Sequence, residues 1–113
     1  MILYGIKNCD TVKKARARLD AAETPYTFHD YKTAGIDPGT LDAWIDRVGW
    51  EPLLNRAGTT FRKLPDADKV DLDGAKAKAL MLGQPSIIKR PVVEFPGGLL
   101  VGFKPAEWDA ADL

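Results

Sequence analysis

A single cysteine, Cys9, is the residue in this chain best suited to nucleophilic chemistry. It follows the apolar run 2–6 and precedes a helix-like stretch that begins at Asp10. Backbone N–H groups at a helix N-terminus lack intrahelical partners and the helix dipole is positive there, so a thiolate is favoured and the pKa of the thiol falls. Such a thiolate can attack a disulfide or another oxidised group. The alternative is that Cys9 is a small buried hydrophobic residue, a frequent fate of a free cysteine.

Positive charge is concentrated around Cys9. The segment from Met1 to Leu19 carries five basic residues and one acidic residue, Asp10, and therefore a net charge of +4. It can attract an anionic substrate, unless the basic helix face is simply solvated. The whole chain has sixteen basic and sixteen acidic residues. Because this balance provides no global field for nucleic acid or an anionic membrane, we expect neither as a partner.

The composition predicts one globular domain covering residues 1–113. Hydrophobic residues make up 45% and charged residues 28%, which excludes long disorder and membrane spans. One cysteine excludes an intramolecular disulfide, and no signal-peptide pattern opens the chain, so we expect a cytoplasmic protein. His29 is the only histidine, and the usual metal-ligand spacing is absent. We therefore expect no metal and no bound cofactor.

The elements that must position Cys9 follow from hydrophobic spacing. Residues 2–6 predict a buried strand, and the aromatic stretch 26–31 predicts a second one. Between them, Val12, Ala15 and Leu19 recur at helical spacing in a helix that ends near Ala22. Strand, helix and strand together predict a right-handed parallel unit, with the thiol at the carboxyl end of the first strand.

The rest of the chain predicts a helical block and then a hairpin. Asp37 and Pro38 favour a helix start, and Gly49 a helix stop. Further predicted elements are a short helix at 52–55, a polar loop to 64, a helix at 71–82, hairpin strands at 92–95 and 99–103, and a final helix from Pro105. The predicted order is β-α-β, a helical insertion at about 37–82, and then β-β-α.

Four separated motifs stand out in the chain. They are Tyr4-Gly5-Ile6-Lys7-Asn8-Cys9-Asp10-Thr11, Phe28-His29-Asp30-Tyr31, Gly58-Thr59-Thr60-Phe61-Arg62-Lys63-Leu64 and Ile87-Ile88-Lys89-Arg90-Pro91. Together they resemble the arsenate reductase-like (ArsC) family, and within it the YffB-like branch, which is related to Spx-type proteins. The resemblance to the family implies an α/β thioredoxin-like fold with a mixed sheet and a helical insertion. The resemblance to the YffB-like branch implies a glutathione-dependent thiol reductase.

The resemblance also implies roles for individual residues. Cys9 matches the family's nucleophile, Arg90 its arginine before the hairpin, and Pro91 its cis-proline. An arginine before a proline is also held in an extended backbone, which fixes its direction. Thr59, Thr60, Arg62 and Lys63 are expected to form a polar wall facing the thiol. The full expected set is Cys9 and Arg90 as catalytic residues, with Lys7, Asn8, Arg56, Arg62, Pro91 and Lys104 binding substrate.

Three functions remain open from the sequence. The first is thiol oxidoreduction, in which Cys9 attacks an oxidised substrate and forms a mixed species with it. With one cysteine there is no internal resolving thiol, so an external thiol such as glutathione must release Cys9 from that species. The second function is arsenate reduction. Against it, Asn55 follows the Leu-Leu pair where arsenate reductases have arginine, Arg56 comes one place later, and Lys104 replaces another arginine. The third is an Spx-type module that contacts RNA polymerase, although Val12 stands where those regulators usually carry a second cysteine.

Overall fold

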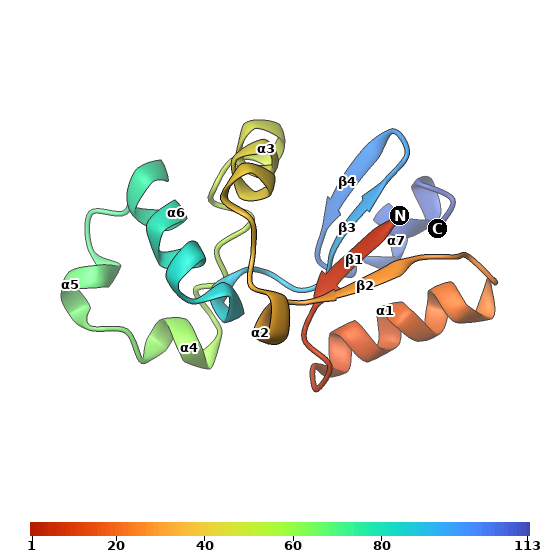
Figure 1. Cartoon of the computed structure of the whole chain (residues 1–113), viewed down its shortest axis with the longest axis horizontal. Coiled ribbons are helices and arrows are strands. Elements are labelled where there is room, and N and C mark those ends of the chain that lie inside the picture. The colour runs from red at the N-terminus through yellow and green to blue at the C-terminus, as the bar shows by residue number, and fades with distance from the viewer. The chain divides into compact units, whose positions relative to one another are not determined.

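The computed structural model describes all residues 1–113, and the chain forms two compact units. The sheet unit consists of Met1–Ala34 together with Arg90–Leu113, and the helical unit is Gly35–Lys89. The elements of the sheet unit are β1 (Ile2–Gly5), α1 (Asp10–Ala21), β2 (Thr27–Asp30), α2 (Tyr31–Ala34), β3 (Val92–Phe95), β4 (Gly98–Val101) and α7 (Pro105–Ala110) (Figure 1). Those of the helical unit are α3 (Pro38–Val48), α4 (Thr59–Arg62), α5 (Asp66–Lys69), α6 (Gly74–Gly83) and the 3-10 turn η1 (Pro85–Ile87).

The four strands of the sheet unit form one mixed sheet in the order β2-β1-β3-β4. β1 runs parallel to β2 and antiparallel to β3, and β3 and β4 form the hairpin. The α/β thioredoxin-like fold expected from the sequence is confirmed. This topology brings the end of β1, the end of β2, the start of β3 and the end of β4 to the same end of the sheet, where the candidate site lies.

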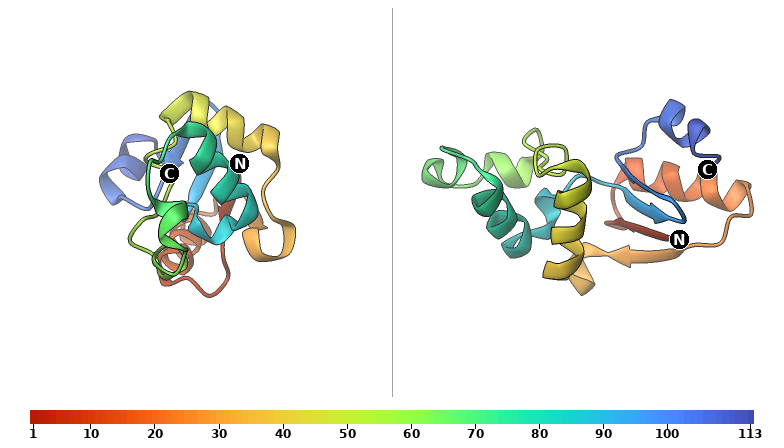
Figure 2. Two further views of the ribbon diagram at one scale, coloured as in Figure 1. Left: turned by 90° about the vertical axis from the view of Figure 1, so that its left-hand side faces the viewer. Right: turned by 90° about the horizontal axis from the view of Figure 1, so that it is seen from above.

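One face of the sheet carries the core of this unit. The helical stripe of Val12, Ala15 and Leu19 is fully buried against Leu3 and Val93. Trp108 of α7 joins the same cluster, and α1 and α7 lie on the same side of the strands (Figure 2). Because apolar burial is the main stabilising term in folding, this packing fixes the direction in which α1 leaves β1.

The helical unit has its own core and its own helix caps. Its buried apolar residues are Leu41, Trp44, Leu53, Leu54, Phe61, Leu64, Ala77, Met81, Ile87 and Ile88. As expected, Asp37 caps α3, and its carboxylate accepts a hydrogen bond from the Thr40 N–H at 3.0 Å. A salt bridge of 2.6 Å between Lys78 and Asp42 joins α6 to α3.

Some predicted boundaries were wrong. Tyr31 starts α2 instead of ending β2, because the Asp30 carboxylate accepts a hydrogen bond from the Lys32 N–H at 2.9 Å and turns the chain. The helix expected at 71–82 begins after Asp73, whose carboxylate caps it, while Asp71 adopts a left-handed backbone with φ of 52°.

The segment around the short helix expected at 52–55 is also different. It is a turn in which Leu54 pairs with Ile88 as an isolated bridge. The polar loop expected to reach residue 64 contains the helical turn α4, and the last hairpin strand stops at Val101, before Phe103. No helix in the structure combines the length and apolar character needed to cross a membrane.

Candidate active site

Cys9 lies at the first backbone position before α1, directly after the turn that leaves β1. Its backbone is extended, with φ of −99° and ψ of 122°, and its carbonyl accepts the first helical hydrogen bond from the Lys13 N–H at 2.9 Å. Its side chain is partly exposed. The sulfur is therefore held at a helix N-terminus and can still be reached from solvent, as exchange chemistry requires.

The close approach of α1 to β1 depends on Gly5. A β-carbon at this position would lie 2.7 Å from Cγ2 of Val12, which is too close for real atoms. Val12 is fully buried in the core and belongs to the first turn of α1. Glycine at position 5 thus permits the packing that fixes the first turn of the helix and, with it, the sulfur of Cys9.

Arg90 reaches the same end of the sheet from the other terminal part of the chain. The Arg90–Pro91 peptide bond is cis, as expected, and β3 starts at the next residue. Since β3 is antiparallel to β1, with Val92 paired to Tyr4, the start of β3 lies beside the end of β1. The Arg90 side chain hydrogen bonds to Cys9. The structure therefore brings together the two residues that the sequence selected as catalytic.

The surroundings of Cys9 lower the pKa of its thiol. Burial acts in the opposite direction and raises the pKa, but four attractive interactions outweigh it. They come from the Val12 N–H, from the hydrogen bond and the positive charge of Arg90, and from the Thr11 N–H. The net effect favours a thiolate.

Tyr31 is a member of this region that the sequence reasoning missed. It follows β2 directly, and its side chain is buried with 2% exposure. Its ring stacks on Tyr4 with centroids 6.2 Å apart and meets the edge of His29 at 6.1 Å. Its hydroxyl has no hydrogen-bond partner. Burial is the main cause that raises the pKa of Tyr31, and Tyr4 raises it further, while the nearby charge of Arg90 acts in the opposite direction. Because the net shift is upward, the phenol stays neutral.

Three further expected residues belong to the sheet unit. Lys7 and Asn8 are exposed in the turn between β1 and α1, next to Cys9 in the chain. Lys104 precedes α7. Because Val101, at the end of β4, pairs with Val92 at the start of β3, the chain leading to Lys104 leaves the sheet at the same end as Cys9. None of the three contributes to the pKa shift of Cys9.

The two remaining expected arginines belong to the helical unit. The guanidinium of Arg56 lies over the ring of Trp50, 5.5 Å from its centroid. The carbonyl of Arg62 accepts a hydrogen bond from Lys69 Nζ at 2.8 Å. All groups that shift the pKa of Cys9 come from the sheet unit, so roles for Arg56 and Arg62 in substrate binding stay predictions.

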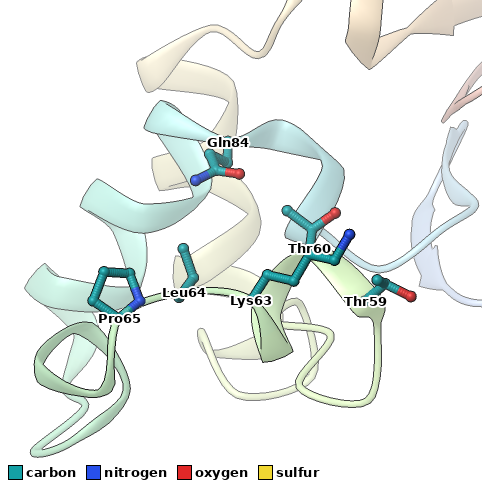
Figure 3. A pocket seen from close by; sticks show the side chains of 6 residues that line it. All are labelled: Thr59, Thr60, Lys63, Leu64, Pro65 and Gln84. Carbon is teal, nitrogen blue, oxygen red and sulfur yellow. The ribbon is translucent and has the colours of Figure 1, made fainter.

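Part of the expected polar wall lines a cavity in the helical unit. Thr59, Thr60 and Lys63 face a space of about 240 Å³ (Figure 3). The other lining residues are Leu64, Pro65 and Gln84, and Arg62 is not among them. The expected wall is thus only partly formed around this space, and the expectation that it faces the thiol stays a prediction.

Comparison with known proteins identifies the family. Residues 4–111 match the model of the ArsC family. A solved structure of a YffB protein is 61% identical, with a TM-score of 0.93, and the match covers 97% of this chain and 96% of that one. An arsenate reductase (ArsC) related protein from Brucella melitensis is 59% identical, with a TM-score of 0.77, 96% of this chain and 91% of that chain being covered.

A more distant relative is the global transcriptional regulator Spx 1 of Lactococcus lactis. It is 25% identical over 93% of this chain and 83% of its own length. The family match spans β1 to α7 and includes both Cys9 and Arg90. The chain therefore belongs to the ArsC family, with a YffB protein as a similar structure and an Spx regulator as a distant homologue.

Proposed function

We propose that this protein is a thiol oxidoreductase that uses Cys9 as its nucleophile and glutathione as the external resolving thiol. The observation that carries the proposal is the hydrogen bond between Arg90 and the partly exposed sulfur of the only cysteine in the chain. A stabilised thiolate is a nucleophile at neutral pH. A chain with one cysteine cannot resolve its own mixed disulfide, so a second thiol has to come from solution.

The proposed reaction has two exchange steps. In the first, the Cys9 thiolate attacks the glutathionyl sulfur of an oxidised substrate R–S–S–G; the Cys9–S–S–G bond forms, the substrate S–S bond breaks, and R–S⁻ leaves with the electron pair. In the second, a glutathione thiolate attacks the glutathionyl sulfur, which forms oxidised glutathione and returns the Cys9 thiolate. Arg90 and the N–H groups of Thr11 and Val12 stabilise the negative sulfur before the first step and after the second.

The proposal is tested by treating the protein with oxidised glutathione and recording its intact mass. We expect one glutathionyl adduct that maps to Cys9 and that excess reduced glutathione removes. Cys9→Ser should form no adduct, and it should have no activity on a glutathionylated model thiol in an assay coupled to glutathione oxidation. An intermolecular Cys9–Cys9 dimer as the main product, or no adduct at all, would exclude this mechanism.

Arsenate reduction is a second candidate, because the chain belongs to the ArsC family and a 59% identical relative is described as arsenate reductase related. The site is less suited to it. Asn55 and Lys104 stand where the resemblance implies arginines, and a planar guanidinium fits a tetrahedral oxyanion better than an ammonium does. Glutathione-dependent arsenite production by the wild type and not by Cys9→Ser would favour this candidate.

A binding role like that of Spx regulators is the third candidate, motivated by the distant Spx relative. Val12 occupies the position three residues after Cys9, so this chain lacks the second cysteine of a Cys-x-x-Cys switch. Retention of purified RNA polymerase by the immobilised protein would support this role. Cys9→Ser in the same assay separates redox-controlled binding from binding that is independent of the thiol.

A further inference from the structure

The cavity of about 240 Å³ in the helical unit is lined by a group of hydrogen-bond donors that the proposed thiol chemistry does not use. Thr59 and Thr60 come from α4, Lys63 follows α4, and Gln84 directly follows α6 (Figure 3). The hydroxyls, the ammonium and the amide make no hydrogen bond or ion pair within the molecule. Four residues that carry potential donors therefore line one space, and their side chains have no internal partners.

The other lysines that lie between α4 and the end of α6 are engaged differently. Lys69 donates to the Arg62 carbonyl at 2.8 Å, Lys76 donates to the Ala67 carbonyl at 2.8 Å, and Lys78 forms its salt bridge with Asp42. Lys63 is the one lysine of this stretch whose ammonium has no partner within the molecule, and it lines the cavity. Its charge is available to an incoming anion without the loss of an existing contact.

The remaining lining defines the chemistry of a ligand. Leu64 and Pro65 provide an apolar surface, and Leu64 is buried with 8% exposure. No acidic side chain lines the cavity to compete for Lys63. One cation matches a monoanion, whereas a phosphate of roughly −1.5 to −2 charge would be left undercompensated. The volume of this open space lies below the roughly 300 Å³ at which pockets for drug-sized ligands begin, so it suits a small group.

We propose that this cavity binds a carboxylate carried on a short apolar stem. Lys63 supplies the charge, the Thr59 and Thr60 hydroxyls and the Gln84 amide supply hydrogen bonds, and Leu64 and Pro65 contact the stem. The C-terminal end of a small peptide and a free organic acid both present this chemistry. The site does not depend on the reactivity of Cys9, so it can be tested with probes that have no thiol.

The test is a titration of the whole ¹⁵N-labelled protein, followed by NMR at the backbone amides of Thr60, Lys63 and Gln84. N-acetylglycine is the carboxylate probe, and N-acetylglycinamide is its neutral match. We expect saturable shifts with the acid and none with the amide. Lys63→Met should weaken binding about two- to fivefold, as expected for the loss of an exposed ion pair. Thr60→Val should weaken it by a smaller factor.

Arg47→Met is the matched control, because Arg47 is an exposed cation of the same unit that does not line the cavity. It should leave the affinity for N-acetylglycine unchanged. Equal shifts with the neutral amide, equal losses in Lys63→Met and Arg47→Met, or tighter binding of inorganic phosphate would each overturn the assignment.

S-methylglutathione, which has no reactive sulfur, then identifies the source of the carboxylate. Binding tighter than that of N-acetylglycine indicates a peptide ligand, and weaker binding indicates a free acid. Neither probe carries a thiol, and both should lose affinity in Lys63→Met and keep it in Arg47→Met. Failure of this proposal would therefore leave the proposed glutathione chemistry at Cys9 untouched, and the reverse also holds.

Discussion

Replacement of Arg90 by methionine should make Cys9 a slower nucleophile at neutral pH. Arg90 acts on the sulfur through a hydrogen bond and through its charge. A hydrogen bond to a charged group contributes about 1.5–3 kcal/mol, and the lower end applies here because Cys9 is partly exposed and solvent screens the interaction. Since about 1.4 kcal/mol corresponds to a factor of ten, the thiol should ionise roughly tenfold less readily. The Thr11 and Val12 amides remain.

The assay is the rate of alkylation by iodoacetamide, followed by intact mass across the pH range from about 5 to 10. At pH values below the pKa of the wild-type thiol the variant should react up to roughly tenfold more slowly than the wild type, and the two rates should converge at high pH, where both thiols are ionised. Arg90→Lys keeps the charge and loses the planar fork, so it should fall between them. Arg47→Met, which removes an exposed cation of the helical unit, is the control. A wild-type pH profile in Arg90→Met would refute the reasoning.

Three further predictions concern stability in urea denaturation. Gly5→Ala should lower the free energy of unfolding by about 1–3 kcal/mol, because the new methyl overlaps Val12. The double variant Gly5→Ala/Val12→Ala should recover part of the loss that the overlap causes. A Gly5→Ala variant as stable as the wild type would contradict the close packing. The lowered pKa of Cys9 adds stability that is fully present above the pKa of an unfolded cysteine, about 8.5, and is lost as the pH falls through the folded value. The stability of the wild type relative to Cys9→Ser should therefore rise with pH up to about 8.5, and a constant difference would show that the pKa is not lowered. Tyr31→Phe removes a buried hydroxyl without a partner and should be neutral or stabilising, so a loss above about 1 kcal/mol would reveal a hidden partner.

Local signals in the sequence predicted the elements that carry the site. The spacing of Val12, Ala15 and Leu19 predicted α1, and all three are fully buried in it. Asp37 and Pro38 predicted the start of α3, where Asp37 forms the expected cap. These predictions succeed because helix periodicity and capping depend on residues a few positions apart.

Features that depend on tertiary packing could not be predicted in this way. Asp71 and Asp73 are equally good helix caps by residue type, and only the packing of the folded unit decides for Asp73. Tyr31 continued an aromatic strand pattern, and its burial beside Tyr4 became visible only with the sheet in place. The partnership of Cys9 with Arg90 joins residues far apart in the chain, so local spacing could not predict it; the family resemblance and the fixed direction of an arginine before a proline both pointed to it.

The discontinuous construction of the sheet unit has a consequence for the newly made chain. β3, which lies between β1 and β4, follows the entire helical unit in sequence. Because chains are synthesised from the N-terminus, the helical unit leaves the ribosome before Arg90 and β3 do. During that interval Cys9 lacks the hydrogen bond and the positive charge of Arg90, so we expect it to react more slowly than in the finished fold. The order of elements along the chain thus delays full activation of the thiol until Arg90 and β3 have been made.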